Sequence, residues 1–215
     1  VNKVSVADIK FEGNPALIEV IGKEIDDIYL AKVKELSIDP ACIARQKDLK
    51  IVYTPLHGTG MMLIPQALKM WGFENVHTVP EQMVKSGDFP TVQSPNPENG
   101  EALTMALNLA KQLDADIVMA SDPDADRVGM ACKDDKGEWV LIDGNQTCMI
   151  FLYYIIMNRK AQGKMQGNEF VVKTIVTTEL IKEIAAKYEK NHDLAQALWK
   201  ENIRECKILA GMLQP

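Results

Sequence analysis

The sequence predicts an α/β protein with three layers, in which a mostly parallel sheet carries helices on both faces. Between residues 49 and 142, short apolar runs of strand length alternate with helical patterns and brief connectors. Such alternation is typical of parallel sheets covered by helices. Two β-rich runs flank a turn sequence at 134–137, which adds an antiparallel hairpin after an aspartate-rich loop.

The part of the chain before residue 80 is expected to begin with a helix of about six turns. Asn14 is a good N-cap, Pro15 suits the first helical position, and apolar residues then recur at helical spacing as far as Leu36. The elements expected next are a strand at 49–53, a helix at 61–71 ended by Gly72, and a strand at 75–79.

After this first part, the chain is expected to form a long irregular loop and a second series of elements. Residues 80–100 contain four of the ten prolines, and loops of this length in compact domains are usually functional or mobile. The elements expected beyond the loop are a helix at 101–113, strands at 116–120, 128–132 and 138–142, a helix at 146–160, a strand at 169–176 and a helix capped by Thr177 or Thr178.

The composition argues against several kinds of partner. With a formal net charge of −6 there is no basic stripe to meet a phosphate backbone, so no nucleic-acid partner is expected. The four cysteines lie far apart without a Cys-x-x-Cys pair, which argues against structural zinc and for a reduced, cytoplasmic protein. The longest apolar stretch, at 149–157, is too short to cross a bilayer, and the first residues do not resemble a signal peptide. No membrane partner is expected, and the missing initiator Met indicates a fragment of a longer protein.

Three carboxylates stand at alternate positions between residues 121 and 128. Asp122, Asp124 and Asp126 follow an apolar run of strand length, so they are expected at the carboxyl end of a buried strand, where open α/β sheets place their ligands. Neighbouring anions repel one another, and a hard divalent cation such as Mg²⁺ removes that conflict with oxygen ligands alone. Arg127 adds a planar donor group suited to phosphate. The segment therefore indicates metal-assisted phosphoryl transfer.

Two simpler interpretations of this segment are a calcium-binding EF-hand and a solvated turn. An EF-hand loop that starts at Asp122 requires Gly at its sixth position and Glu at its twelfth, where this sequence has Arg127 and Lys133. A solvated turn does not account for the apolar strands on both sides of the segment. The metal site is therefore the favoured interpretation.

Four segments, in this order, resemble the second domain of the α-D-phosphohexomutases, in the phosphoglucomutase/phosphomannomutase branch. They are 54–60 (TPLHGTG), 88–98 (DFPTVQSPNPE), 122–127 (DPDADR) and 143–147 (DGNQT). The resemblance extends over residues 1–185 and implies a second domain followed by the start of a third.

The resemblance implies an intramolecular phosphotransferase that interconverts hexose 1-phosphate and hexose 6-phosphate through hexose 1,6-bisphosphate. These sugar phosphates are the expected partners. Asp122, Asp124 and Asp126 would each hold Mg²⁺ through one carboxylate oxygen, and Asp126 and Arg127 would contact the sugar phosphate. A phosphoserine from the first domain would complete the coordination of the metal.

The same resemblance divides the chain into four parts. They are the end of a first domain with a linker helix (1–25), the second domain with the metal loop (26–142), the start of a third domain (143–185), and a helical tail that departs from the family (186–215). The catalytic serine motif of the first domain is not in the sequence. Ser94 lies in a Ser-Pro-Asn-Pro run without a base nearby in sequence to activate it. We therefore expect no catalytic residue within this chain, and no activity from the chain alone.

Two further functions are compatible with the same residues. A haloacid-dehalogenase-like phosphatase also places an Asp-x-Asp after a parallel strand, and Asp122 would then be the nucleophile. The other alternative is a module that binds metal or sugar phosphate without catalysis. His57 either helps to bind an anion at a helix N-terminus or, as we favour, is a structural loop histidine.

Overall fold

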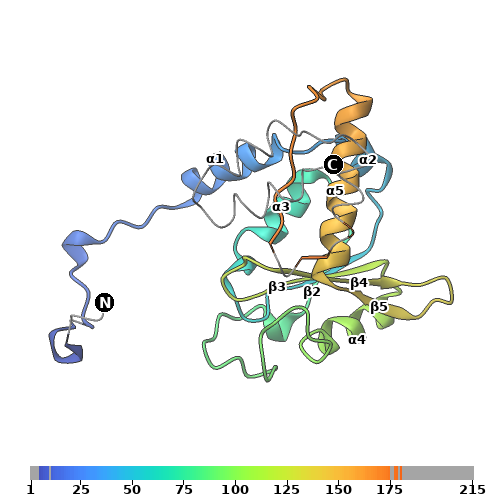
Figure 1. Ribbon diagram of the computed structural model, residues 1–215. Helices are drawn as coiled ribbons and strands as arrows, with labels where there is room; N and C mark the ends of the chain where they lie inside the picture. The colour runs from blue at the N-terminus through green and yellow to red at the C-terminus, as the bar shows by residue number, and fades with distance from the viewer. Residues whose placement is uncertain (1–4, 10, 175–176, 179, 181–215) are drawn as a thin grey trace. The chain divides into compact units, whose positions relative to one another are not determined.

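The computed structural model describes residues 5–9, 11–174, 177–178 and 180. The chain divides into two compact units, of which the first ends at Ser37 and the second begins at Ile38. The sheet and the aspartate-rich loop belong to the second unit (Figure 1). No helix within the described ranges is long and apolar enough to cross a membrane.

The helical part of the first unit is shorter than predicted. After a first 3-10 turn, η1 (Val6–Asp8), Asn14 caps only the 3-10 turn η2 (Pro15–Leu17). The α-helix α1 covers Lys23–Lys34. The prediction of one helix from Pro15 to Leu36 is therefore wrong. The segment 18–22 contains three β-branched residues and a glycine, which lower helix propensity between the two helical pieces.

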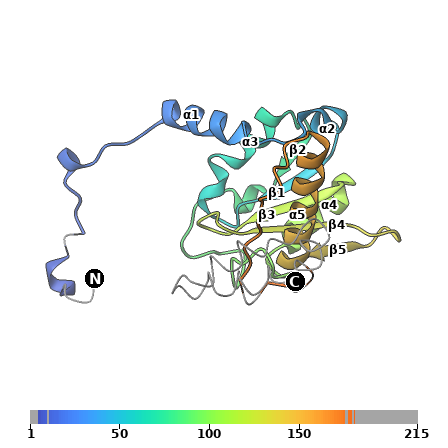
Figure 2. The same cartoon turned by 45° about the horizontal axis from the view of Figure 1, so that its top comes forward.

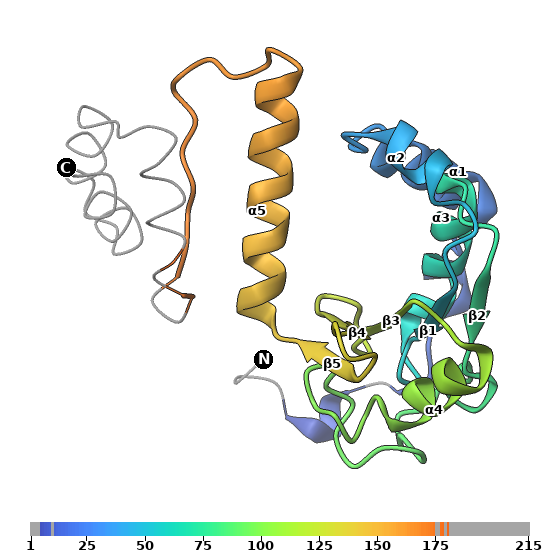
Figure 3. The same ribbon diagram turned by 90° about the vertical axis from the view of Figure 1, so that its right-hand side faces the viewer.

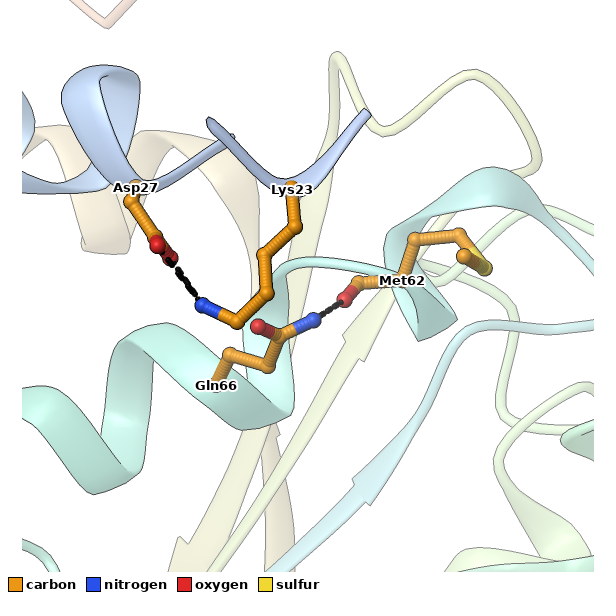
Figure 4. A network of polar contacts seen from close by, with 4 residues as sticks. All are labelled: Lys23, Asp27, Met62 and Gln66. Carbon is orange, nitrogen blue, oxygen red and sulfur yellow. Dashed lines mark hydrogen bonds and ion pairs between the residues drawn. The ribbon is translucent and has the colours of Figure 1, made fainter. Parts of the chain in front are cut away.

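The surface of α1 is apolar along one stripe and charged elsewhere. Leu30 is its one buried residue, whereas Ile25, Ile28 and Tyr29 are exposed. Lys23 Nζ lies 2.5 Å from Asp27 Oδ1, one helical turn along α1 (Figure 4). Both side chains are more than half exposed, so this pair contributes little to stability.

The second unit is built on a five-stranded sheet with the order β2-β1-β3-β4-β5. Its strands are β1 (Ile51–Thr54), β2 (Val76–Thr78), β3 (Ile117–Ser121), β4 (Val128–Lys133) and β5 (Trp139–Ile142). β1 pairs in parallel with β2 and with β3, whereas β3–β4 and β4–β5 are antiparallel. Figure 2 shows β1, β3, β4 and β5 following one another across the sheet.

This topology confirms the predicted α/β class and the hairpin after the aspartate-rich loop. The prediction of a mostly parallel sheet is wrong: the sheet is mixed, because both strands that follow that loop run antiparallel to their neighbours. At the hairpin, Asp134 N–H donates to Glu138 O over 2.8 Å, and Gly137 has the positive φ of 81° that such turns favour. The five predicted strands between 49 and 142 all form, with ends that differ from the prediction by at most two residues.

Helices cover the sheet on both sides. α3 (Ile64–Trp71) connects β1 to β2, and α4 (Thr104–Leu113) connects β2 to β3. Figures 1 and 3 draw α3 and α4 on opposite sides of the sheet. The core between α4 and the sheet consists of small or β-branched residues that permit close packing, namely Val52, Val79, Ala106, Ala110, Ala115, Val118 and Ala131.

Both ends of α3 show how local sequence sets the boundaries of a helix. The 3-10 turn η3 (Thr59–Met61) precedes it, and the side-chain amide of Gln66 donates to Met62 O in the turn before α3 (Figure 4). The helix ends at Gly72. Its φ of 108° confirms the left-handed cap that the sequence predicts. The structure also has a short helix that was not predicted, α2 (Pro40–Arg45), with the N-cap Asp39 and proline at its first position.

Replacing Gly72 by alanine is expected to destabilise the protein by about 1 kcal/mol, because a Cβ is unfavourable in the left-handed region. Urea unfolding should show a lower midpoint with an unchanged slope. Gly87→Ala is the matched control, since Gly87 has no positive φ and a Cβ there would meet no atom within 4 Å. Equal midpoints for the two variants would contradict this account of the cap.

The chain beyond the sheet begins with α5 (Gly144–Ala161), the longest helix among the described residues, which follows β5 directly (Figure 3). Asp143 and Gln146 form a reciprocal capping box at its start. No strand is present at 169–174, so the prediction of a strand over 169–176 is wrong for these residues, and 175–176 lie outside the described residues. A strand needs a neighbour to pair its backbone groups, and the described residues provide none there. Thr178 Oγ1 accepts from Leu180 N–H, as a cap would, while the helix predicted after it and the tail at 186–215 lie outside the described residues.

Candidate metal centre

The aspartate-rich loop follows the central strand β3, on the side of the sheet where the parallel strands β1 and β3 have their carboxyl ends. In the register of β1 and β3, Thr54 lies opposite Ala120. The loop after β1 and the loop after β3 therefore leave the sheet side by side. This is the predicted location, since ligands of open α/β sheets bind at the carboxyl ends of parallel strands. β4 begins at Val128, which limits the loop to residues 122–127.

The structure brings the three predicted carboxylates together. One oxygen each of Asp122, Asp124 and Asp126 lies within 4.8 Å of the others. Asp122 is buried with 6% of its surface exposed, whereas Asp124 and Asp126 are exposed. Ala125 has a φ of 61°, and this left-handed residue turns the chain between the last two aspartates.

The three carboxylates repel one another. The pKa of Asp126 is raised above its usual value, first by the hydrogen bond with the Asp122 side chain and then by the charges of Asp124 and Asp122. Arg127 lowers it in part, with Nε 3.8 Å from Asp126 Oδ1 and 3.6 Å from Asp122 Oδ2. Asp122 Oδ1 also accepts from the backbone N–H of Arg127 over 3.0 Å. One guanidinium cannot balance three carboxylates, and the loop retains an excess of negative charge.

This donor set fits a hard divalent cation. Mg²⁺ and Ca²⁺ both prefer carboxylate oxygens. Two oxygens bound to one Mg²⁺ lie at most about 4.2 Å apart, and two bound to one Ca²⁺ at most about 5 Å apart. The observed spread of up to 4.8 Å therefore accommodates Ca²⁺ directly and Mg²⁺ after a closure of less than 1 Å. The two exposed side chains can supply that small movement by rotation.

The base of the aspartate-rich loop is held by the loop that follows β1. Thr59 donates to Pro123 O twice, from its backbone N–H over 2.8 Å and from its hydroxyl over 3.0 Å. A Cβ at Gly58 would lie 2.3 Å from Pro123 Cα, so only glycine permits this approach of the two backbones. Pro123 lies between the first two aspartates. The position of the carboxylates therefore depends on the loop at 55–60.

A buried hydroxyl pair lies beneath both loops. The Tyr53 hydroxyl and Ser121 Oγ are 2.8 Å apart. Burial raises the pKa of Tyr53 to about 12, against the opposing effect of the Ser121 hydrogen bond, so the phenol is neutral at pH 7. Gly60 lies over the pair, since a Cβ there would come within 2.5 Å of both oxygens. These residues were not anticipated from the sequence, because the pairing joins positions 68 residues apart.

His57 is buried beside this loop rather than open to an anion. Its exposed fraction is 3%, and both ring nitrogens are hydrogen-bonded, Nδ1 to Val84 O at 2.9 Å and Nε2 to Thr91 Oγ1 at 2.8 Å. This geometry supports the interpretation as a structural loop histidine. Ser94 is exposed in the proline-rich loop.

The proline-rich loop at 80–100 packs its backbone against β4. It begins with the 3-10 turn η4 (Pro80–Gln82) and continues without regular structure, as predicted. Pro97 is fully buried, and a Cβ at Gly129 would lie 2.2 Å from Pro97 O. The loop is therefore a packed part of the second unit and contacts the strand that begins just after the aspartates.

Residues 27–137 match the protein family described as phosphoglucomutase/phosphomannomutase, alpha/beta/alpha domain II. A protein of Haemophilus influenzae named as a probable phosphomannomutase is 34% identical over 188 residues, which cover 87% of this chain and 37% of that protein. A phosphoglucomutase of Staphylococcus haemolyticus is 32% identical over 186 residues, which cover 85% of this chain and 32% of that protein.

Solved structures show the same fold. The crystal structure of a phosphoglucomutase/phosphomannomutase family protein from Burkholderia thailandensis superimposes with a TM-score of 0.54 at 18% sequence identity. The superposition covers 82% of this chain and 35% of that one. The chain thus spans about a third of the length of the proteins that it matches.

Proposed function

This chain belongs to the phosphoglucomutase/phosphomannomutase family, and we propose that it supplies the metal-binding part of a cytoplasmic hexose-phosphate mutase. The observation that carries the proposal is the convergence of Asp122, Asp124 and Asp126 at the carboxyl end of β3. We assign all three as Mg²⁺ ligands. Asp126 and Arg127, on the exposed side of the loop, are the residues that contact the sugar phosphate.

The proposed chemistry is the interconversion of hexose 1-phosphate and hexose 6-phosphate through hexose 1,6-bisphosphate. When bound, the metal neutralises negative charge on the phosphoryl group in transfer. Arg127 has a guanidinium with five donors, and its side chain is 59% exposed, so it can turn from the carboxylates toward a phosphate. Asp122 is the fixed member of the set, because its carboxylate is buried and tied to the backbone of the loop.

The proposal assigns residues 26–142 to the second domain of the mutase and 143–185 to the start of the third. The nucleophilic serine belongs to a domain that this sequence does not include. The chain alone is then expected to convert no glucose 1-phosphate, even with Mg²⁺ and glucose 1,6-bisphosphate present. Phosphorus NMR of the mixture measures that conversion directly.

Binding of glucose 1,6-bisphosphate provides the test of the proposed function. We expect calorimetry to detect binding in Mg²⁺ and none in EDTA, since without a cation the carboxylates repel the phosphate groups. Binding that is equally strong in EDTA would contradict the proposal. A covalent or beryllium fluoride adduct on Asp122 would instead identify the haloacid-dehalogenase-like phosphatase.

The variant Arg127→Gln is expected to weaken binding of the bisphosphate by about 10-fold or more in Mg²⁺, because a hydrogen bond to a charged group contributes about 1.5–3 kcal/mol. Its affinity for the metal alone should not fall, since the substitution removes a cation from beside the carboxylates. Arg45→Gln is the matched control, because Arg45 is exposed on α2 and contacts Asp39 only at 3.7 Å. Equal bisphosphate affinities for the two variants would show that Arg127 does not bind the bisphosphate.

A further inference from the structure

A chain of hydrogen bonds runs in one direction from Thr54 to Val84. The Thr54 hydroxyl donates to Gln82 Oε1 over 2.6 Å, and Gln82 Nε2 donates to Thr91 Oγ1 over 3.0 Å. Thr91 Oγ1 lies 2.8 Å from His57 Nε2, and His57 Nδ1 lies 2.9 Å from Val84 O. Thr54, Gln82 and His57 are buried, so these bonds have little competition from water.

The direction of this chain determines the tautomer of His57. A carbonyl oxygen can only accept, so His57 Nδ1 must carry the proton that is donated to Val84 O. Thr91 Oγ1 already accepts from Gln82, and its own proton is then donated to His57 Nε2. A proton on Nε2 would leave the Thr91 hydroxyl hydrogen without an acceptor in this series of hydrogen bonds. The network is complete only with a neutral, Nδ1-protonated imidazole.

The backbone of His57 is fixed to the same part of the proline-rich loop. Its N–H donates to Gln82 O over 3.1 Å, and its carbonyl accepts from Ser86 N–H over 3.2 Å. The residue has a φ of 66°, a conformation in which histidine is enriched relative to most side chains. Ring and backbone together attach the turn after β1 to residues 82–91.

That turn is the one that holds the aspartate-rich loop. Gly58, the next residue, lies against Pro123 Cα, and Thr59 donates two hydrogen bonds to Pro123 O. Pro123 separates Asp122 from Asp124. A shift of His57 would therefore move the backbone between two of the three carboxylates, and a continuous series of contacts connects Thr91 to the metal loop.

We propose that His57 is a positioning residue, whose Nδ1-protonated ring, held by Thr91 and Val84, sets the spacing of the aspartates through Gly58, Thr59 and Pro123. This inference rests on the proposed function, because the spacing matters for a metal. His57 contacts neither the metal nor the substrate. Its role is to keep the carboxylate oxygens within the range that one cation can bridge.

The test compares Thr91→Val with the conservative variant Thr91→Ser in the full chain. Valine removes the hydroxyl that completes the chain of hydrogen bonds, whereas serine keeps it. We expect Thr91→Val to weaken Mn²⁺ binding by about 10-fold. This is the lower end of the range by which metal affinity falls when a residue that supports the metal ligands is replaced. Thr91→Ser should restore the affinity to within about 3-fold of the wild type.

Two structural readouts accompany the titration. Nitrogen NMR of the wild-type ring should show a protonated Nδ1 and an unprotonated Nε2 at His57. Hydrogen exchange of the Thr59 amide, which donates to Pro123 O, should be faster in Thr91→Val than in Thr91→Ser by about 10-fold, a weakening of about 1.4 kcal/mol.

The outcomes separate this inference from the proposed function. A protonated Nε2, or a Thr91→Val variant with wild-type Thr59 exchange, overturns the positioning role. A wild-type chain that binds no Mn²⁺ contradicts the proposed metal site, while the tautomer and the Thr59 exchange still decide the role of His57. A variant that loses thermal stability but keeps its Mn²⁺ affinity and Thr59 exchange shows a merely structural threonine and also overturns the inference.

Discussion

Replacing Gly129 by alanine is expected to destabilise the protein by about 3 kcal/mol, the upper end of the usual cost of overpacking. The new Cβ would lie 2.2 Å from Pro97 O and 2.7 Å from both Pro97 C and Pro97 Cβ. Two of these atoms belong to the backbone of a fully buried residue, so no side-chain rotation relieves the clash. Either β4 or the proline-rich loop must move.

Urea unfolding measures the effect of Gly129→Ala, with Gly100→Ala as the control. A Cβ at Gly100 meets only Leu141 Cδ2, at the ordinary contact distance of 3.8 Å. The control should therefore change stability by less than about 1 kcal/mol. A Gly129→Ala variant as stable as the control would show that the proline-rich loop is not packed against β4 in solution.

Replacing Asp126 by asparagine is expected to change stability in opposite directions with and without metal. The pKa of Asp126 is raised by its hydrogen bond with Asp122 and by the neighbouring charges of Asp124 and Asp122. A raised pKa means that the folded protein disfavours the ionised carboxyl, which costs stability at pH 7. This cost disappears as the pH falls below the ordinary range of an aspartate. Asparagine carries no charge and removes this cost. The unfolding midpoint of Asp126→Asn in EDTA at pH 7 should therefore be higher than that of the wild type.

In Mg²⁺ the same variant should lose stability relative to the wild type. Asparagine replaces a charged ligand. Loss of a residue that only hydrogen-bonds to a ligand typically weakens metal binding by about 10-fold, so loss of a direct ligand should weaken it by at least about that much. The metal then stabilises the folded state less. Asp135→Asn, an equal change of charge at the exposed hairpin turn, is the control and should shift alike in both buffers. A difference in midpoint between Asp126→Asn and the wild type that is the same in EDTA and in Mg²⁺ would contradict the metal site.

The fold of the second unit could be predicted because its signals are local. Each strand near the site is a short apolar run, and Gly72 marks a helix end by its own conformation. The aspartate-rich loop was located for the same reason, since it follows the buried strand β3 directly. Local patterns therefore predicted where the carboxylates lie.

Two predictions are wrong because apolar spacing alone determines neither helix propensity nor the presence of a strand partner. The apolar residues between Leu17 and Leu36 have helical spacing, yet three β-branched residues and Gly22 interrupt the helix. Residues 169–174 have strand composition and form no strand, since sheet pairing depends on a neighbour. Composition alone does not supply that partner.

The contacts that support the site were beyond sequence reasoning for a different reason. Nothing in the sequence pairs Thr54, Gln82 and Thr91, whose hydrogen bonds join β1 to two positions of the proline-rich loop. Thr59 and Pro123 are 64 residues apart. Such pairings depend on how the loops after β1 and β3 meet at the sheet edge, which only the three-dimensional arrangement reveals.

The most direct test of the metal site is a Mn²⁺ titration of the chain, observed as amide line broadening by NMR, beside an Asp124→Ala variant. We expect broadening at residues 121–128 and at Thr59, which touches the base of the loop. In the variant that local broadening should disappear, because one of three ligands is lost. Absence of local broadening at millimolar Mn²⁺, or the same broadening in the variant, would contradict the assignment of these aspartates as metal ligands.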